Sequence, residues 1–155
     1  MATVSCYDVY GKAVPVATES IAFRPAVYGI LIENDQVLLL RHPRTELWYP
    51  PGSVLASHDT PTQTVRHYFR QLTGMTPILG PLLFVEDQYY IDDARQAWHL
   101  SVLYYVLDRP VATATTPADV ESSAEPDWLP LVELKRNQMQ FGYEAIQAGW
   151  LRLRL

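Results

Sequence analysis

The sequence predicts an α+β fold in which a mixed β-sheet is sandwiched between α-helices. Three observations support this prediction. Apolar runs typical of strands occur both before and after the middle of the chain. One helix with clear start and stop signals lies between these two groups of strands, and a second helix is predicted at the C-terminal end. With 48% hydrophobic and 19% charged residues, residues 1–155 are predicted to form a single domain.

The strands before the helix follow a mixed N-terminal segment. Residues 1–23 alternate only weakly and are interpreted either as edge strands or as an arm on a partner subunit. Residues 26–33 and 36–41 are two apolar runs rich in β-branched and aliphatic side chains. Asn34 and Asp35 separate these runs and predict a tight hairpin turn.

The central helix is predicted over residues 61–72. Thr60 offers a hydroxyl N-cap, and Pro61 suits the first helical position. Gly74 supplies the left-handed residue that commonly follows the end of a helix. Residues 42–52, which precede this region, are rich in proline and predict a loop.

The strands after the helix are rich in Val, Phe and Tyr and span residues 82–90 and 97–107. Residues 109–127 are poor in bulky apolar side chains and rich in Ala, Thr, Ser and Pro, which predicts a long exposed loop. Residues 128–134 are interpreted as a strand that enters a short helix. Residues 141–153 have the apolar spacing of an amphipathic terminal helix.

Composition excludes several classes of function. The net charge of −5 argues against a nonspecific nucleic-acid binder, which needs a basic surface. No apolar run approaches the ~20 residues needed to span a bilayer, and the N-terminal residues do not resemble a signal peptide. Cys6 is the single cysteine, so an internal disulfide is excluded. These features predict a cytoplasmic protein that binds neither nucleic acid nor membrane.

The segment from Pro51 to Gly74 carries the most informative pattern. Pro51 and Gly52 open it, and Gly74 closes it. With Pro51 and Gly74 as anchors, the segment is similar, without a gap, to the Nudix box of the MutT-like hydrolases. That box runs from a Pro-Gly-Gly opening through a first glutamate to an Arg-Glu pair, a Glu-Glu pair and a final glycine. Pro51, Gly52 and Gly74 therefore keep the frame of the box.

Most of the chemistry of the box is missing. Asp59 stands where the first glutamate belongs. The first glycine and both charged pairs are also replaced. Ser53 stands in place of the glycine, His67 and Tyr68 in place of Arg-Glu, and Gln71 and Leu72 in place of Glu-Glu. The sequence is therefore identified as resembling the Nudix family with a degenerate box.

Other parts of the chain extend the resemblance. Four segments follow the order and spacing of the family, namely residues 24–28, 37–41, 46–52 and 128–134. Together with the box they cover roughly residues 24–153, which implies the Nudix fold. The resemblance also implies a substrate built as a nucleoside diphosphate linked to another group. It implies Mg²⁺ or Mn²⁺, which would activate water for attack at phosphorus.

The helix predicted over residues 61–72 lacks what such a metal needs. Mg²⁺ requires oxygen ligands that converge on one point, and the family places glutamates on one helix face, four residues apart. Here Tyr68 and Leu72 hold those two positions, and neither has a carboxylate. The main prediction is therefore a weakly active or non-catalytic protein that binds a nucleotide or a phosphorylated metabolite. Mg²⁺ or Mn²⁺ is expected only if the protein is active, and otherwise no cofactor.

An active hydrolase is the alternative. It would use Asp59 with Glu86 or Asp87 as catalytic residues, and Asp59 with Gln71 as metal ligands. Each has a simpler interpretation. Asp59 suits the N-terminal end of a helix, where the helix dipole favours negative charge. Glu86 and Asp87 suit a point where a strand emerges into solvent.

Substrate-binding candidates are basic or aromatic. Arginines suit phosphate, and aromatic rings suit a base or a pocket wall; the candidates are Arg24, Arg41, Arg44, Trp48, Tyr68 and Tyr90. The simpler interpretation of each aromatic residue is packing in a core or an interface. A second alternative is accordingly a structural protein that forms a homodimer through its N-terminal arm and C-terminal helix.

Overall fold

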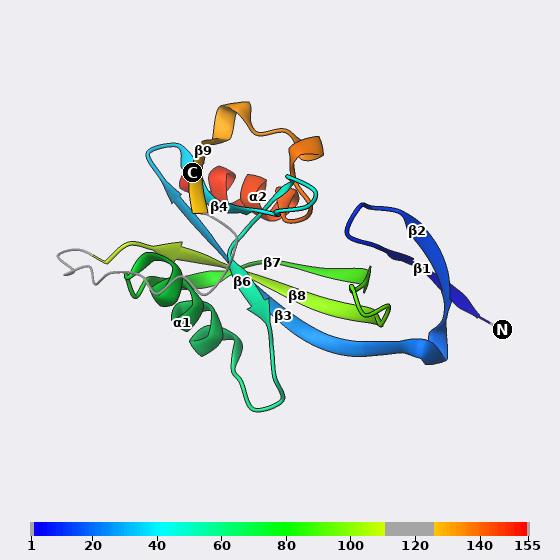
Figure 1. Cartoon of the computed structure of the whole chain (residues 1–155). Coiled ribbons are helices and arrows are strands. Elements are labelled where there is room, and N and C mark those ends of the chain that lie inside the picture. Colours follow the sequence, from blue (N-terminus) through cyan, green and yellow to red (C-terminus); the bar gives the residue numbers. More distant parts are fainter. Residues whose placement is uncertain (1, 111–125, 155) are drawn as a thin grey trace.

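The structure is a computed structural model that describes residues 2–110 and 126–154 (Figure 1). In these residues the strands are β1 (Thr3–Tyr7), β2 (Ala13–Ala17), β3 (Ile21–Glu33), β4 (Gln36–Arg41), β5 (Trp48–Tyr49), β6 (Gly52–Val54), β7 (Ile78–Ile91), β8 (Ala97–Asp108) and β9 (Pro126–Pro130). The α-helices are α1 (Pro61–Thr73) and α2 (Tyr143–Leu153), and the 3₁₀ turns are η1 (Thr18–Ser20), η2 (Leu131–Glu133) and η3 (Arg136–Gln138).

The strands join one mixed sheet. Neighbouring strands follow the order β2-β1-β7-β8-β3-β4-β5, with β6 paired to β3 and β9 paired to β4. β3 and β8 run parallel over a long register from Ile21 opposite Ala97 to Leu31 opposite Leu107. The pairs β7–β8 and β3–β4 are antiparallel. The predicted mixed sheet is therefore confirmed.

The two helices cover opposite faces of this sheet (Figure 1). Side chains alternate between the faces along a strand, and β3 illustrates the alternation. Ala26 and Ile30 join the core under α2, whereas Val27 and Leu31 join the core under α1. The predicted sandwich of a sheet between helices is confirmed, and its physical basis is this double-sided burial of β3.

The turn between β3 and β4 has the geometry that its sequence predicts. Asn34 has φ 51° and Asp35 has φ 60°. Two successive residues with positive φ are typical of a type I′ turn, which Asn and Asp tolerate better than most residues. Glu33 pairs with Gln36 directly across this turn.

α1 begins and ends close to its predicted limits. Gly74 has φ 76°, and its N–H donates to the carbonyl of Arg70 at 2.8 Å. Thr60 is the N-cap residue, but its hydroxyl donates to Oε1 of Gln63 at 3.0 Å and accepts no backbone N–H. The cap position is thus right, and the expected capping hydrogen bond is replaced by a contact between side chains.

The N-terminal segment forms strands at one edge of the sheet. β1 and β2 pair antiparallel, from Thr3 opposite Ala17 to Tyr7 opposite Ala13. β1 then pairs with β7 through Tyr7 and Tyr90, which places this hairpin far from α1 (Figure 1). At the other end of the chain, β9 leads into η2 as predicted. Most of the loop predicted over residues 109–127 lies outside the described residues.

Candidate functional site

The frame of the box is held by steric requirements of the fold. A Cβ atom at Gly52 would lie 2.1 Å from the carbonyl oxygen of Val27 and 2.6 Å from Cα of Tyr28. β6 therefore approaches β3 only because residue 52 has no side chain. The carbonyl of the buried Pro51 accepts the N–H of Gly29 at 2.9 Å. These contacts hold β6 against β3, and Gly74 ends α1.

Packed side chains occupy the two positions of α1 at which the resemblance implies carboxylates. Tyr68 and Leu72 pack with Leu40 of β4 and Tyr49 of β5 in one small apolar cluster. Leu72 is only 6% exposed. Phe69, between them on α1, is fully buried. This face of the helix therefore serves as a core surface.

A cavity of about 460 Å³ lies beside α1, and we call it the box-helix cavity. It brings together three of the predicted residues, Asp59, Tyr68 and Gln71. Ser53 and His67, which replace other residues of the box, line it as well. Asp59 is the only carboxylate among the described lining residues, which include neither lysine nor arginine.

The carboxylate of Asp59 is engaged by its own loop. Its Oδ2 accepts the N–H of Ala56 at 3.0 Å, and its Oδ1 lies 3.6 Å from Nε2 of His58. The same loop is closed by the N–H of Asp59, which donates to the carbonyl of Ala56. Asp59 thus stabilises the turn that leads into α1, and its carboxylate receives no hydrogen bond from an α1 backbone N–H in the described residues.

The described residues do not fit a Mg²⁺ or Mn²⁺ site. Across residues 2–110 and 126–154, no group of three or more His, Cys, Asp and Glu side chains could hold a metal ion. In the box-helix cavity, Gln71 would add one neutral amide oxygen to a single, already engaged carboxylate. Mg²⁺ needs several converging oxygen ligands.

Glu86 and Asp87 lie inside a strand and not at its end. They pair with Val102 and Ser101 in the middle of the β7–β8 ladder, so the interpretation as a strand end is wrong. Oε1 of Glu86 accepts the hydroxyl of Tyr104 and, at 3.2 Å, Nε2 of Gln88. The two acids line a different cavity from Asp59.

This second cavity has a volume of about 530 Å³, and we call it the N-terminal cavity. Its walls come from residues 7–11 of the N-terminal hairpin, residues 86–90 of β7 and residues 139–142 before α2. Glu144 and Leu47 complete the lining. Among the predicted substrate-binding residues, Tyr90 lies here. Burial raises the pKa of the Tyr90 phenol, and Asp93 and Asp92 raise it further.

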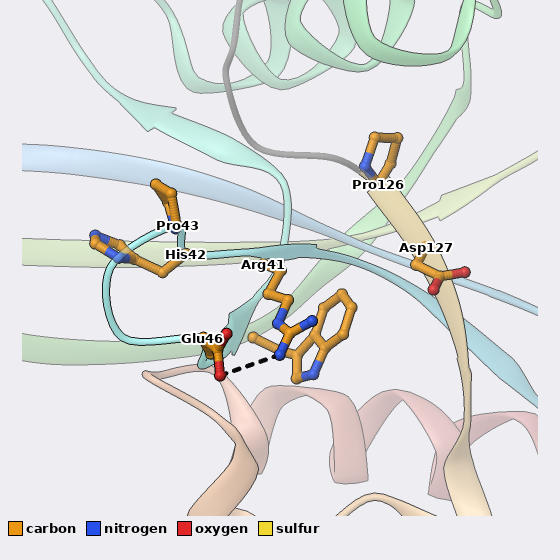
Figure 2. A pocket seen from close by; sticks show the side chains of 7 residues that line it. Arg41, His42, Pro43, Glu46, Pro126 and Asp127 are labelled. Atoms are coloured by element: carbon orange, nitrogen blue, oxygen red, sulfur yellow. Dashed lines mark ion pairs between the residues drawn. The ribbon is translucent and has the colours of Figure 1, made fainter.

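A third cavity of about 340 Å³ lies at the end of β4, and we call it the Arg41 cavity (Figure 2). The guanidinium of Arg41 lies over the ring of Trp48, 5.7 Å from its centroid, and Arg41 Nη2 is 3.4 Å from Oε2 of Glu46. His42 and Asp127 also line the cavity. Burial lowers the pKa of the His42 imidazole, and Arg44 lowers it further. Arg41 and Trp48 are the two predicted binding residues that share a cavity.

The other two predicted arginines are engaged elsewhere. Nη2 of Arg44 lies 2.6 Å from Oδ2 of Asp93 in an exposed ion pair. Arg24 donates from Nε to the carbonyl of Leu55 at 3.4 Å, and its guanidinium lies 5.3 Å from the ring centroid of Trp98. Neither arginine lines any of the three cavities.

Sequence reasoning missed Tyr104, the buried partner of Glu86. Tyr104 is fully buried and lies 6.0 Å from Tyr28 and 6.3 Å from Phe84, measured between ring centroids. The signal that could have found it is positional. Tyr104 is two residues beyond Val102, which pairs with Glu86, and side chains in such diagonal positions come within reach of each other.

The buried tyrosines predict instability at alkaline pH. Burial raises the pKa of Tyr104, and the hydrogen bond to Glu86 raises it further; burial also raises the pKa of Tyr28. The folded pKa then exceeds the ordinary value of 10.0. The fold therefore favours the neutral phenol. Its contribution to the free energy of unfolding is fully present below pH 10 and is lost as the pH rises through the folded pKa. We expect the free energy of unfolding to fall above pH 10 by about 1.4 kcal/mol per pH unit for each tyrosine.

Urea unfolding between neutral and alkaline pH measures this slope. Tyr104→Phe is expected to reduce it by the contribution of one tyrosine, whereas Tyr10→Phe, at an exposed position, should leave it unchanged. Equal slopes in wild type and Tyr104→Phe would contradict the assignment.

The mixed sheet between α1 and α2 is the Nudix fold, as the similarity to solved structures shows. The chain is similar to a NUDIX hydrolase from Nitrosomonas europaea, with a TM-score of 0.63, 12% identity, and coverage of 83% of this chain and 89% of the other. It is similar to a MutT NUDIX hydrolase from Burkholderia pseudomallei, with a TM-score of 0.61, 17% identity, and coverage of 81% and 97%. The third similar structure is an ADP-ribose pyrophosphatase from Streptococcus suis, with a TM-score of 0.61, 12% identity, and coverage of 85% and 92%.

These similarities confirm the predicted fold and extend no further than the fold. No family profile and no curated protein matches the sequence. Within the described residues, neither helix is long and apolar enough to cross a membrane.

Proposed function

We propose that this protein is a Nudix-fold small-molecule-binding protein that does not hydrolyse diphosphates at its box helix. One observation carries the proposal. Tyr68 and Leu72, at the positions where the box places metal-binding carboxylates, pack against Leu40 and Tyr49. Neither side chain carries a carboxylate, and Leu72 is buried while Tyr68 is half-buried, so these two positions of α1 supply no metal ligand.

The remaining acid supports the same conclusion. Catalysis by this kind of site needs a metal that neutralises clustered phosphate charge and activates water. Asp59 already accepts the N–H of Ala56, and Gln71 is neutral. A single carboxylate with an amide oxygen is a poor Mg²⁺ site because the ion demands near-octahedral oxygen ligands.

The ligand that we propose is a nucleotide or a phosphorylated metabolite, held in the Arg41 cavity. Arg41 is the only lysine or arginine among the described residues that line the three cavities. Its guanidinium suits phosphate, and the flat ring of Trp48 beside it suits a base. Glu46 must release Arg41 for this binding (Figure 2). Because half or more of each side chain is exposed, breaking this ion pair costs little free energy.

The test is a panel of nucleotide sugars, ADP-ribose and nucleoside triphosphates, each incubated with Mg²⁺ or Mn²⁺. We expect no release of phosphate or nucleotide above that of the Asp59→Asn variant. We expect the same compounds to bind in calorimetry, about tenfold more weakly to Arg41→Gln. Arg152→Gln, at an exposed position of α2 outside the three cavities, is the matched control and should bind normally.

Two outcomes would change the proposal. Metal-dependent turnover that Asp59→Asn abolishes would establish the alternative, an active hydrolase that uses Asp59 with Glu86 or Asp87. Failure of every compound to bind would remove the ligand from the proposal. Sedimentation equilibrium would then test the second alternative, a structural homodimer through the N-terminal hairpin and α2, by measuring the oligomeric state.

A further inference from the structure

The N-terminal cavity differs chemically from the other two. It joins three segments that are distant in sequence, and the pairing of Tyr7 with Tyr90 holds the N-terminal hairpin against β7. Its volume of about 530 Å³ lies within the range of sites that bind small organic molecules. Five of its lining residues are aromatic: Tyr7, Tyr10, Tyr89, Tyr90 and Phe141.

The charge of this cavity is negative. Its described lining includes no Lys, Arg or His, and it includes four carboxylates: Asp8, Glu86, Asp87 and Glu144. Asp87 pairs with His99, Glu144 pairs with Arg136, and Asp8 accepts two backbone N–H groups of its own turn. Most of these acids therefore have partners within the protein.

Glu86 is engaged by the described residues only through hydrogen bonds, and only at one of its two oxygens. Among the described residues it forms no ion pair. Its Oε1 accepts the hydroxyl of the fully buried Tyr104 and the amide of Gln88, and these two bonds fix the carboxylate. Its Oε2 accepts no hydrogen bond from the described residues. A half-buried carboxylate that is held at one oxygen thus lines a cavity with five aromatic side chains.

We propose that the N-terminal cavity binds a small organic ammonium ion. A primary or secondary ammonium group would donate to Oε2 of Glu86, a charge-assisted hydrogen bond. Aromatic rings attract cations through their faces, so Tyr7, Tyr90 and Phe141 favour the same ligand and cover its apolar body. The carboxylates repel phosphate, so this cavity and the Arg41 cavity favour ligands of opposite charge.

The experiment is a titration of the full chain with phenethylamine, followed by two-dimensional NMR of the backbone amides. Its neutral analogue 2-phenylethanol has the same body and lacks the charge. We expect phenethylamine to bind with a Kd of about 1 mM or tighter, with shifts at residues 7–11 and 86–90, and the alcohol to bind at least about tenfold more weakly.

Three variants identify the source of the affinity. Glu86→Gln keeps an oxygen that accepts the Tyr104 hydroxyl and loses the charge, so we expect Kd to rise about tenfold or more. Tyr90→Leu, which removes one aromatic wall, should also weaken binding. Glu133→Gln, at an exposed acid outside the cavity, should leave Kd unchanged.

The proposal is overturned if phenethylamine causes no saturable shift at about 10 mM. It is equally overturned if the alcohol binds as tightly as the amine, if Glu86→Gln binds normally, or if AMP displaces the amine from residues 86–90. None of these readouts depends on phosphate release, so this proposal and the proposed absence of hydrolysis can fail separately.

Discussion

Gly52→Ala is expected to reduce the free energy of unfolding by at least about 3 kcal/mol. The added Cβ would lie 2.1 Å from the carbonyl oxygen of Val27 and 2.6 Å from Cα of Tyr28. Both are backbone atoms of β3, which carries the parallel ladder with β8 and core side chains on both faces. No rotation of a side chain relieves such a contact, so β6 must separate from β3.

Urea unfolding of the variant beside Ser53→Ala measures this effect. Ser53 is the next residue of β6, and within residues 2–110 and 126–154 its hydroxyl donates only to the carbonyl of Val54. The Ser53 variant should therefore lose about 1 kcal/mol or less. A Gly52→Ala protein as stable as Ser53→Ala would show that β6 can move away from β3 at little cost.

Phe69→Ala is expected to cost about 3–5 kcal/mol of stability. Phe69 is fully buried and packs in the core under α1 with Val27, Leu31 and Leu107. Its ring also lies against Gly29, where an added Cβ would be 2.7 Å from Cε2 of Phe69. Removing the ring leaves a cavity between α1 and β3 that the glycine backbone cannot fill.

The matched control on the same helix is Arg66→Ala. Arg66 is exposed, so its removal should change stability by no more than about 0.5 kcal/mol. Thermal and urea unfolding of the two variants would separate a core role of α1 from a general sensitivity of the helix. A loss below about 1 kcal/mol for Phe69→Ala would contradict the assigned packing.

The parts of the fold that sequence predicts well are those set by local chemistry. Asn34 and Asp35 tolerate positive φ, and the two strands beside them are apolar, so the hairpin is visible in the sequence. Gly74 likewise ends α1 in a left-handed conformation. The frame of the box fixes the fold further because Gly52 has a steric role that no other residue can take.

The site was less predictable because its contacts join distant segments. The engagement of Arg44 with Asp93 and of Glu86 with Tyr104 depends on which strands are neighbours and in what register. The sequence allows two roles for Asp59, as a metal ligand or as an acid favoured by the helix dipole. In the structure its carboxylate accepts the N–H of Ala56, a contact that the sequence does not predict. Residue type gave the candidates, and the arrangement of strands divided most of them among three cavities and left Arg24 and Arg44 outside all three.

The packing of Tyr68 and Leu72 also limits what evolution can do with this chain. A glutamate introduced at position 72 would place a charge in a site that is 6% exposed, before any second ligand or metal was present to stabilise it. This substitution would therefore lower the stability of the fold. A metal ligand at position 72 would therefore require compensating changes in the apolar cluster of Leu40, Tyr49 and Tyr68.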